Sequence, residues 1–212
     1  MAEELRAAGW PVLSTSGPEQ APRTWADVVE HLLTQLPAER EVILVPHSNA
    51  GLFVPGLWAR RQVVGAVFVD AGLPPSTGTV ALAPPSHLAR LATLAGSDGR
   101  LPPWSDWWPP ADVAGLFGST GLQREVVAEE ARLPLDYFRG MMPVPRGWDE
   151  GLPAAYLAFG ETYAAERSDA AKRGWPTRTL AGRHLHMLVD PAEVASALLE
   201  LLGLVSTSRG PA

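Results

Sequence analysis

The fold is decided by the stretch Glu41-Val42-Ile43-Leu44-Val45-Pro46-His47-Ser48-Asn49-Ala50-Gly51. In it an apolar, β-branched run ends at a serine flanked by small residues, and an amphipathic segment follows over residues 52–61. A buried strand that turned sharply into a helix would expose the Ser48 hydroxyl at the turn, where it could act as a nucleophile. A serine is also a favoured helix N-cap. On this stretch alone, both interpretations of Ser48 stay open.

The composition is that of one folded domain. The chain has 212 residues, of which 46% are hydrophobic and 19% charged, so we expect a packed core and little disorder. The formal net charge is −6, and no basic run stands out. Nucleic acid is therefore a poor candidate partner.

The residue types that are absent narrow the chemistry further. The chain has no cysteine, which excludes disulfides, thiolate metal sites and a cysteine nucleophile. We expect neither a metal nor a cofactor. No apolar run approaches the roughly 20 residues of a membrane span, and the acidic N-terminus does not resemble a signal peptide. We therefore expect a soluble, cytoplasmic protein with no membrane partner.

Strand and helix patterns alternate along the chain, which predicts an α/β fold with a mostly parallel sheet and helices on both faces. Thr24 and Asp27 match a capping box at the start of one helix, and Asp190 is expected to cap the last helix. The predicted strands cover residues 10–14, 41–46, 63–70, 154–159 and 177–180. Continuous apolar runs in the second and third strands are typical of a sheet that is covered on both faces.

Between residues 73 and 150 the composition changes. Prolines become frequent, and four of the eight tryptophans occur there, namely Trp104, Trp107, Trp108 and Trp148. Short amphipathic pieces predict small helices in an irregular layer that lies over the sheet. We therefore divide the chain into a core of residues 1–72 and 151–212 and an inserted cap of residues 73–150.

Three stretches together resemble the α/β-hydrolase superfamily. They are Pro46-His47-Ser48-Asn49-Ala50-Gly51, Val67-Phe68-Val69-Asp70, and Gly182-Arg183-His184 running on to Asp190-Pro191. The order serine, acid, histidine also matches that superfamily, although Pro46 and Ala50 occupy positions where its serine turn usually has glycine. The resemblance covers nearly the whole chain and implies a cap domain at residues 73–150. It also implies hydrolysis of a carboxylic ester or thioester, with Ser48 forming a covalent acyl-enzyme.

The resemblance implies His184 as the base that activates Ser48, because the superfamily's histidine commonly lies shortly before the last helix. His186 is the competitor, and alternation along the loop would otherwise turn it towards the cap. The acid stays open between two residues. Glu161 follows the strand predicted at 154–159, where the superfamily usually places its acid, and Asp70 ends the preceding strand. Of these two we favour Glu161.

The oxyanion hole is the main departure from the superfamily's pattern. The resemblance implies one donor, the backbone N–H of Asn49, and a second from a loop after an earlier strand. That strand and loop have no counterpart in this sequence. In the superfamily's sheet that strand lies between the strands that match residues 10–14 and 41–46. Either the sheet rearranges, or this is an N-terminally shortened hydrolase fold, and we favour the second. We also expect slower catalysis, because losing one oxyanion donor typically costs about 10²–10³ in rate.

The aromatic and methionine side chains of the cap have two interpretations. Trp104, Trp107 and Trp108 either form the cap's own core or line an apolar pocket, and Met141 and Met142 could line it as well. The second interpretation favours a small apolar or aromatic substrate.

Three functions are consistent with this sequence, because one fold hosts many functions. The first is a serine hydrolase. The second is a lyase or cyclase of small-molecule biosynthesis that uses His184 without an acyl-enzyme. The third is a protein that binds a ligand without turning it over.

Overall fold

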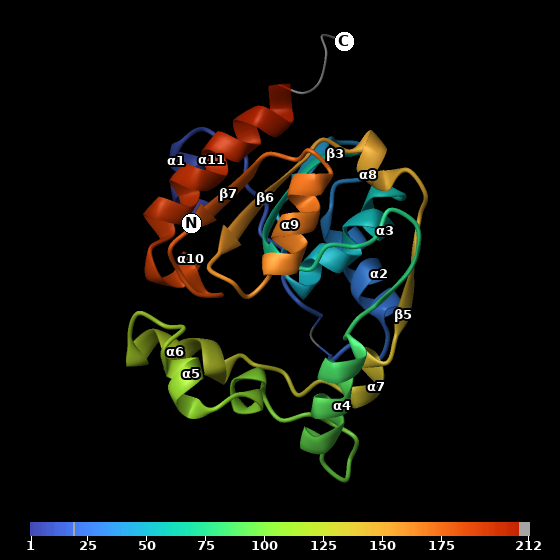
Figure 1. The fold of residues 1–212 in the computed structure, drawn as a ribbon, viewed down its shortest axis with the longest axis vertical. Helices are drawn as coiled ribbons and strands as arrows, with labels where there is room; N and C mark the ends of the chain where they lie inside the picture. The colour runs from blue at the N-terminus through green and yellow to red at the C-terminus, as the bar shows by residue number, and fades with distance from the viewer. Residues whose placement is uncertain (19, 208–212) are drawn as a thin grey trace.

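A computed structural model describes residues 1–18 and 20–207 (Figure 1). Its central sheet contains β1 (Val42–Leu44), β2 (His47–Ser48), β3 (Val63–Ala71), β6 (Ala154–Phe159) and β7 (Thr177–Leu180). The strand order is β1-β3-β6-β7, β2 also pairs with β3, and every pair is parallel. The predicted parallel sheet is therefore confirmed, and the carboxyl ends of its strands meet at one edge.

Helices cover both faces of the sheet, as predicted. They are α1 (Ala2–Ala7), α2 (Trp25–Gln35), α3 (Val54–Trp58), α9 (Ala164–Lys172) and α11 (Pro191–Thr207). Along β3, Val67 and Val69 pack in one cluster with α1 and α11. Phe68 points to the other face and packs with α2, α3 and α9. Figure 1 shows α1 and α11 on one side of the sheet and α2 and α3 on the other.

Two helix starts follow the capping signals in the sequence. The Thr24 hydroxyl accepts from the Asp27 N–H (3.3 Å), and the Asp27 carboxylate accepts from the Thr24 N–H (2.8 Å). The Asp190 carboxylate accepts from the Glu193 N–H (2.9 Å) at the start of α11. Both predicted caps are confirmed, and each satisfies N–H groups that the first turn leaves without an intrahelical partner.

Residues 10–14 do not form the strand that their sequence predicts. They lie alongside β1, across a groove of about 710 Å³ that both segments line. Within residues 1–18 and 20–207 no further strand pairs with this side of β1, so β1 is an edge of the sheet. A strand needs a neighbouring strand for its backbone groups, and among the described residues this segment pairs with none; the Trp10 N–H donates to the Leu5 carbonyl oxygen (3.1 Å) and the Val12 carbonyl oxygen accepts from the Arg6 side chain (3.2 Å).

The helix predicted for residues 52–61 is shorter and begins differently. A 3₁₀ segment, η1 (Asn49–Phe53), leads into α3, which ends at Trp58. A turn follows it, in which the Arg60 and Arg61 N–H groups donate to the Leu57 carbonyl oxygen (3.0 and 2.9 Å) before β3 begins at Val63.

Residues 73–150 contain a layer of small elements beside the core. Its base is an antiparallel pair, β4 (Gly78–Ala81) and β5 (Met141–Val144). The other elements of the layer are α4 (Pro85–Leu94), η2 (Trp104–Trp107), α5 (Pro110–Ala114), α6 (Thr120–Ala128) and α7 (Leu135–Phe138). The short helix α8 (Trp148–Gly151) lies instead on the body that carries the sheet, where Trp148 packs against Phe68 of β3. Figure 1 shows α4 to α7 below the body that carries the sheet. The division at residues 72 and 150 stays a prediction.

None of the described helices combines the length and apolarity that crossing a membrane requires. The cytoplasmic location stays a prediction.

The packing between β3 and α11 can be tested at two glycines. A Cβ on Gly65 would overlap the Val205 side chain, whereas a Cβ on Gly203 within α11 would meet nothing within 4 Å. Gly65→Ala should lower the free energy of unfolding by about 1–3 kcal/mol through overpacking. Gly203→Ala should raise it by roughly 0.5–1 kcal/mol, because glycine is unfavourable inside a helix. Urea unfolding measures both, and equal effects of the two substitutions would contradict this packing.

Candidate active site

Ser48 sits at a strained turn between β2 and η1. Its backbone has φ 58° and ψ −133°, a conformation that costs a non-glycine residue about 1–3 kcal/mol. Ser48 occupies the N-cap position of η1, but its side chain makes no capping hydrogen bond. Its Oγ lies 3.0 Å from Nε2 of His184 instead. The interpretation of Ser48 as a simple helix cap is therefore wrong.

The turn is held against the end of β3 by close backbone packing. The Gly72 N–H donates to the Ser48 carbonyl oxygen (2.9 Å), and the Val69 N–H donates to that of Pro46 (2.9 Å). A Cβ on Gly51 would overlap the Gly72 carbonyl oxygen. Gly51, one residue after Ala50, therefore allows the serine turn to pack closely against the backbone of Gly72.

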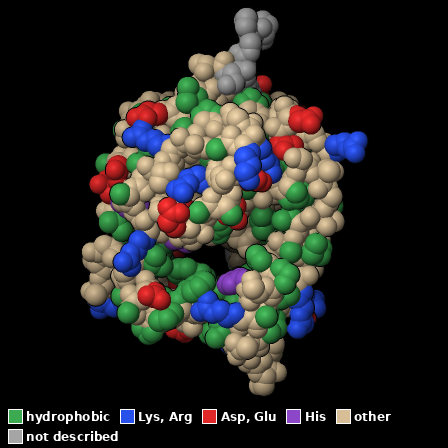
Figure 2. Space-filling view, in the orientation of Figure 1, with side chains coloured by type: hydrophobic (Ala, Val, Ile, Leu, Met, Phe, Trp, Pro, Cys, Tyr) green, Lys and Arg blue, Asp and Glu red, His purple; other side chains and the backbone are tan. Residues whose placement is uncertain are grey.

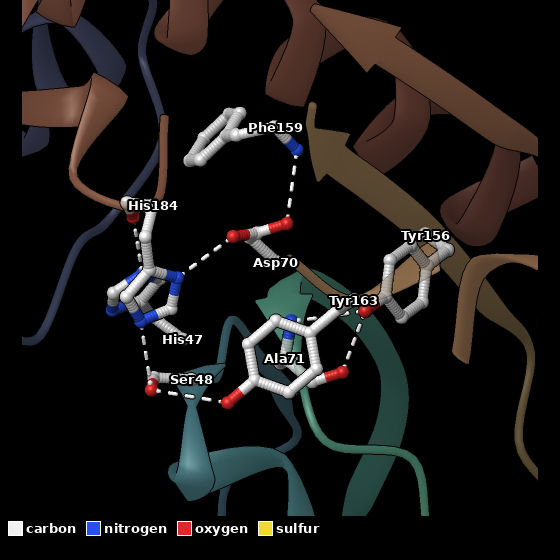
Figure 3. A network of polar contacts seen from close by, with 8 residues as sticks. All are labelled: His47, Ser48, Asp70, Ala71, Tyr156, Phe159, Tyr163 and His184. Carbon is white, nitrogen blue, oxygen red and sulfur yellow. Dashed lines mark hydrogen bonds and ion pairs between the residues drawn. The ribbon is translucent and has the colours of Figure 1, made fainter. Parts of the chain in front are cut away.

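Ser48, His184 and Asp70 form a chain of hydrogen bonds (Figure 3). Nδ1 of His184 lies 2.7 Å from a carboxylate oxygen of Asp70, which can only accept when ionised. Nδ1 therefore carries the imidazole proton, and Nε2 is left to accept from the Ser48 hydroxyl. This is the tautomer that a histidine needs in order to take a proton from a serine.

Asp70 is fully buried, with 0% of its surface exposed. It lies near the end of β3 with a positive φ of 40°. One carboxylate oxygen accepts from His184 and the other accepts from the Phe159 N–H (3.0 Å) at the end of β6. Buried charges need such partners. Here the end of β6 and the loop after β7 supply the two donors that stabilise the Asp70 carboxylate.

The structure does not bring Glu161 to His184. The Glu161 side chain is 78% exposed and pairs with Arg167 on the surface. The reason is the turn before it, where Gly160 has φ 62° and packs so closely on the Gly182 carbonyl that a Cβ would lie 2.7 Å away. This turn directs the following side chain outward, and Asp70 occupies the place beside the imidazole.

His47 supports His184 through its side chain. The two rings stack with centroids 4.5 Å apart, and Nε2 of His47 donates to the His184 carbonyl oxygen (2.9 Å). Burial, and then the neighbouring His184, lower the pKa of His47 to about 4. His47 is therefore neutral at pH 7, which keeps a second positive charge away from His184.

His186 is not turned towards the cap. It is buried, and its Nε2 pairs with the Glu193 carboxylate (2.7 Å) in the first turn of α11. Its ring packs edge-on against Phe159. The residue therefore joins α10 (His186–Val189) to α11 rather than lining a substrate pocket.

Tyr163 is a neighbour of Ser48 that the sequence analysis did not single out. Its phenol oxygen lies 3.4 Å from Ser48 Oγ, and its ring lies 5.6 Å from the His184 ring. It directly precedes α9, in the same loop as Glu161. Its position shortly after the strand at residues 154–159 could have indicated a site residue. Glu161 lies in the same loop, and its carboxylate made it the more obvious candidate.

Asn49 keeps the position expected for an oxyanion donor, directly after Ser48. Its side-chain amide donates to the Leu82 carbonyl oxygen (3.2 Å), which ties the turn to the base of the layer of residues 73–150. The role of its backbone N–H stays a prediction.

The aromatic and methionine candidates divide into two groups. Trp107 is buried, donates to the Pro102 carbonyl oxygen (2.9 Å) and packs edge-on against Phe138. Met142 is only 1% exposed. Both belong to the main hydrophobic core cluster, which also contains Phe68 of β3, and their place in a substrate pocket stays a prediction. The other three candidates stay predictions as pocket residues; Trp104 and Trp108 are partly buried, and Met141 is exposed.

Among residues 1–18 and 20–207, no group of three or more histidine and carboxylate side chains could hold a metal ion.

Comparisons with known proteins agree at the level of the fold. No family model and no curated protein matches the chain. A solved extracellular α/β-hydrolase from a Paenibacillus species matches with a TM-score of 0.73 and 16% identity, over 94% of this chain and 90% of that one. That protein is described as sharing structural and functional homology with tobacco salicylic acid binding protein 2.

Two plant enzymes match in the same way. A methylesterase from Arabidopsis has a TM-score of 0.62 and 16% identity, over 95% of this chain and 90% of that one. A variant of tomato methylketone synthase I, in complex with β-ketoheptanoate, has a TM-score of 0.64 and 16% identity, over 96% and 90%. The fold of this chain is that of the α/β-hydrolase superfamily.

The lowered pKa of His47 predicts how stability depends on pH. Between pH 6.5 and about 4 the unfolded chain binds a proton at His47 that the folded chain excludes, so acid favours unfolding. This residue should therefore cost roughly 2–3 kcal/mol of unfolding free energy at pH 4.5 relative to pH 7.5. His47→Gln keeps an N–H donor for the His184 carbonyl but cannot titrate, so its loss of stability in acid should be smaller by that amount. Urea unfolding at both pH values is the measurement, and an unchanged pH dependence would count against a buried neutral His47.

Proposed function

We propose that this chain is a serine hydrolase that cleaves a small carboxylic ester or thioester through an acyl-enzyme on Ser48. The observation that carries the proposal is the chain of hydrogen bonds from Asp70 through His184 to Ser48, with distances of 2.7 and 3.0 Å. A serine hydroxyl is a weak nucleophile until a neighbouring base takes its proton, and here the base is in contact and held in the required tautomer.

The acylation step follows from this arrangement. Ser48 Oγ attacks the carbonyl carbon while its proton passes to Nε2 of His184. Asp70 stabilises the imidazolium that forms, and the neutral His47 stacked on it adds no repulsion. The tetrahedral intermediate collapses when the leaving alcohol or thiol departs with the proton from His184.

Deacylation uses the same groups in reverse. His184 takes a proton from a water molecule that attacks the acyl carbon, and then returns the proton to Ser48 Oγ. No cofactor is needed for either step.

An apolar or aromatic substrate is the class that we favour. Figure 2 shows a hollow between the body that carries the sheet and the layer of residues 73–150, with hydrophobic side chains along its walls. The contact of Asn49 with Leu82 places the start of this layer beside the serine turn. The hydrophobic side chains along this hollow favour an apolar acyl or aromatic group over a highly charged one.

Ser48→Ala tests the nucleophile. Turnover of p-nitrophenyl butyrate should fall by at least about 10³-fold, and labelling by a fluorophosphonate should disappear. Ser97→Ala, at an exposed serine in the loop after α4, is the matched control and should keep both activities. Full turnover by Ser48→Ala would reject the acyl-enzyme. If that turnover were then lost in His184→Ala, its loss would favour the lyase or cyclase reaction.

A matched pair of carboxylates tests the acid. Asp70→Asn should lower kcat by about 10³–10⁴-fold, because the imidazole loses the partner that holds its tautomer. Glu161→Gln should leave kcat within about twofold, since surface ion pairs contribute little. Both are measured with the same ester, and urea unfolding verifies that Asp70→Asn still folds. The reverse pattern would restore Glu161 as the acid.

A further inference from the structure

We propose that the Tyr163 phenol donates a hydrogen bond to the oxyanion of the tetrahedral intermediate formed on Ser48, which makes Tyr163 a catalytic residue. This inference rests on the serine hydrolase function proposed above and goes beyond it, because it assigns an oxyanion donor outside the backbone of the serine turn.

The direction of the contact follows from counting protons. Ser48 has one hydroxyl proton, and the lone pair of His184 Nε2 at 3.0 Å accepts it. The contact of 3.4 Å between Ser48 Oγ and the Tyr163 phenol can then be a hydrogen bond only if the phenol donates. Among the described residues the phenol has no other hydrogen-bonding partner.

The position of the phenol suits an oxyanion better than it suits Ser48 Oγ. A contact of 3.4 Å is longer than the 2.5–3.0 Å of an ordinary O–H···O bond. The oxyanion of a tetrahedral intermediate lies one bond beyond the carbon that Oγ attacks, so it can be closer to a donor beside Oγ than Oγ itself is. Figure 3 shows His184 and Tyr163 approaching the Ser48 hydroxyl from different directions. The phenol therefore leaves the path of the proton to His184 free.

The surroundings of Tyr163 keep it protonated and in place. Burial raises the pKa of its phenol, so it remains a donor at neutral pH. The backbone of Tyr163 is fixed as the residue before α9, and its carbonyl accepts from the Arg167 N–H (2.9 Å) within that helix. A donor fixed before the reaction begins needs no reorganisation when charge develops.

The step that the phenol assists balances as follows. The Oγ–C bond forms, the Oγ proton moves to His184 Nε2, and the π electron pair of the carbonyl moves onto its oxygen. That oxygen accepts from the Tyr163 O–H and from the Asn49 N–H. When the C–O or C–S bond to the leaving group breaks, the electron pair returns, and both donors release it.

Tyr163→Phe removes only the hydroxyl and is the test. With p-nitrophenyl butyrate, kcat should fall by about 10²-fold, whereas KM should change by less than about threefold. Phenylboronic acid forms a tetrahedral adduct with an active-site serine, and its inhibition constant should rise by a factor similar to the loss in kcat/KM. Tyr137→Phe, at a buried tyrosine of α7, is the matched control and should change neither quantity.

The outcomes separate this inference from the proposed function. If Ser48→Ala is inactive but Tyr163→Phe has wild-type kcat, the role of Tyr163 is overturned and the hydrolase stands. If Ser48→Ala keeps its turnover, the hydrolase itself fails. A lower kcat in Tyr163→Phe with unchanged boronate affinity would also overturn the inference, because the hydroxyl would then act only on free Ser48. Urea unfolding of Tyr163→Phe should give a free energy within about 1 kcal/mol of wild type, so the comparison is made between folded proteins.

Discussion

The buried carboxylate of Asp70 is the interaction on which the candidate site depends. A fully buried charge is tolerated only when its oxygens find donors, and here one donor is the Phe159 N–H and the other is His184. The first donor comes from the end of β6 and the second from the loop after β7, while Asp70 itself lies in β3. The carboxylate therefore joins three neighbouring strand ends. It also sets the tautomer of His184, and through that tautomer the direction of the Ser48 hydrogen bond. Removing the Asp70 carboxylate would therefore change both the packing of these strand ends and the hydrogen bond between His184 and Ser48.

The serine and the histidine could be predicted from sequence because each is flagged by local features. Ser48 follows an apolar run and precedes small residues, and His184 lies between a strand and a capped helix. The acid could not be chosen in this way, because Glu161 and Asp70 both follow predicted strands. What separates them is the conformation of Gly160, whose tight contact with Gly182 turns the next side chain to the surface. That contact joins loops more than twenty positions apart, and no local pattern encodes it.

The roles of the three histidines His47, His184 and His186 also depend on contacts that the sequence does not reveal. His184 contacts a carboxylate and a hydroxyl, His47 donates to a backbone carbonyl, and His186 pairs with Glu193. The position of His184 before the last helix favours it as the base, but the sequence does not reveal the partners of His47 and His186. The partners distinguish the three roles, because a histidine acts as a base only where one nitrogen is held by an acceptor and the other faces the nucleophile. His47 lacks such a nucleophile, and burial keeps it neutral.

The support that the sheet gives the serine turn is one-sided among the described residues. β1 pairs with β3 on one side and borders the groove of about 710 Å³ on the other. Within the sheet, the strained turn at Ser48 is held from the side of β3, where Gly72 and Val69 donate to the turn and Gly51 allows the close approach. Outside the sheet, the Asn49 side chain also ties the turn to Leu82. The side of β3 also carries Asp70, so one strand both restrains the nucleophile and orients its base. This shared support explains how a turn without the usual flanking glycines can keep Ser48 Oγ within hydrogen-bonding distance of His184.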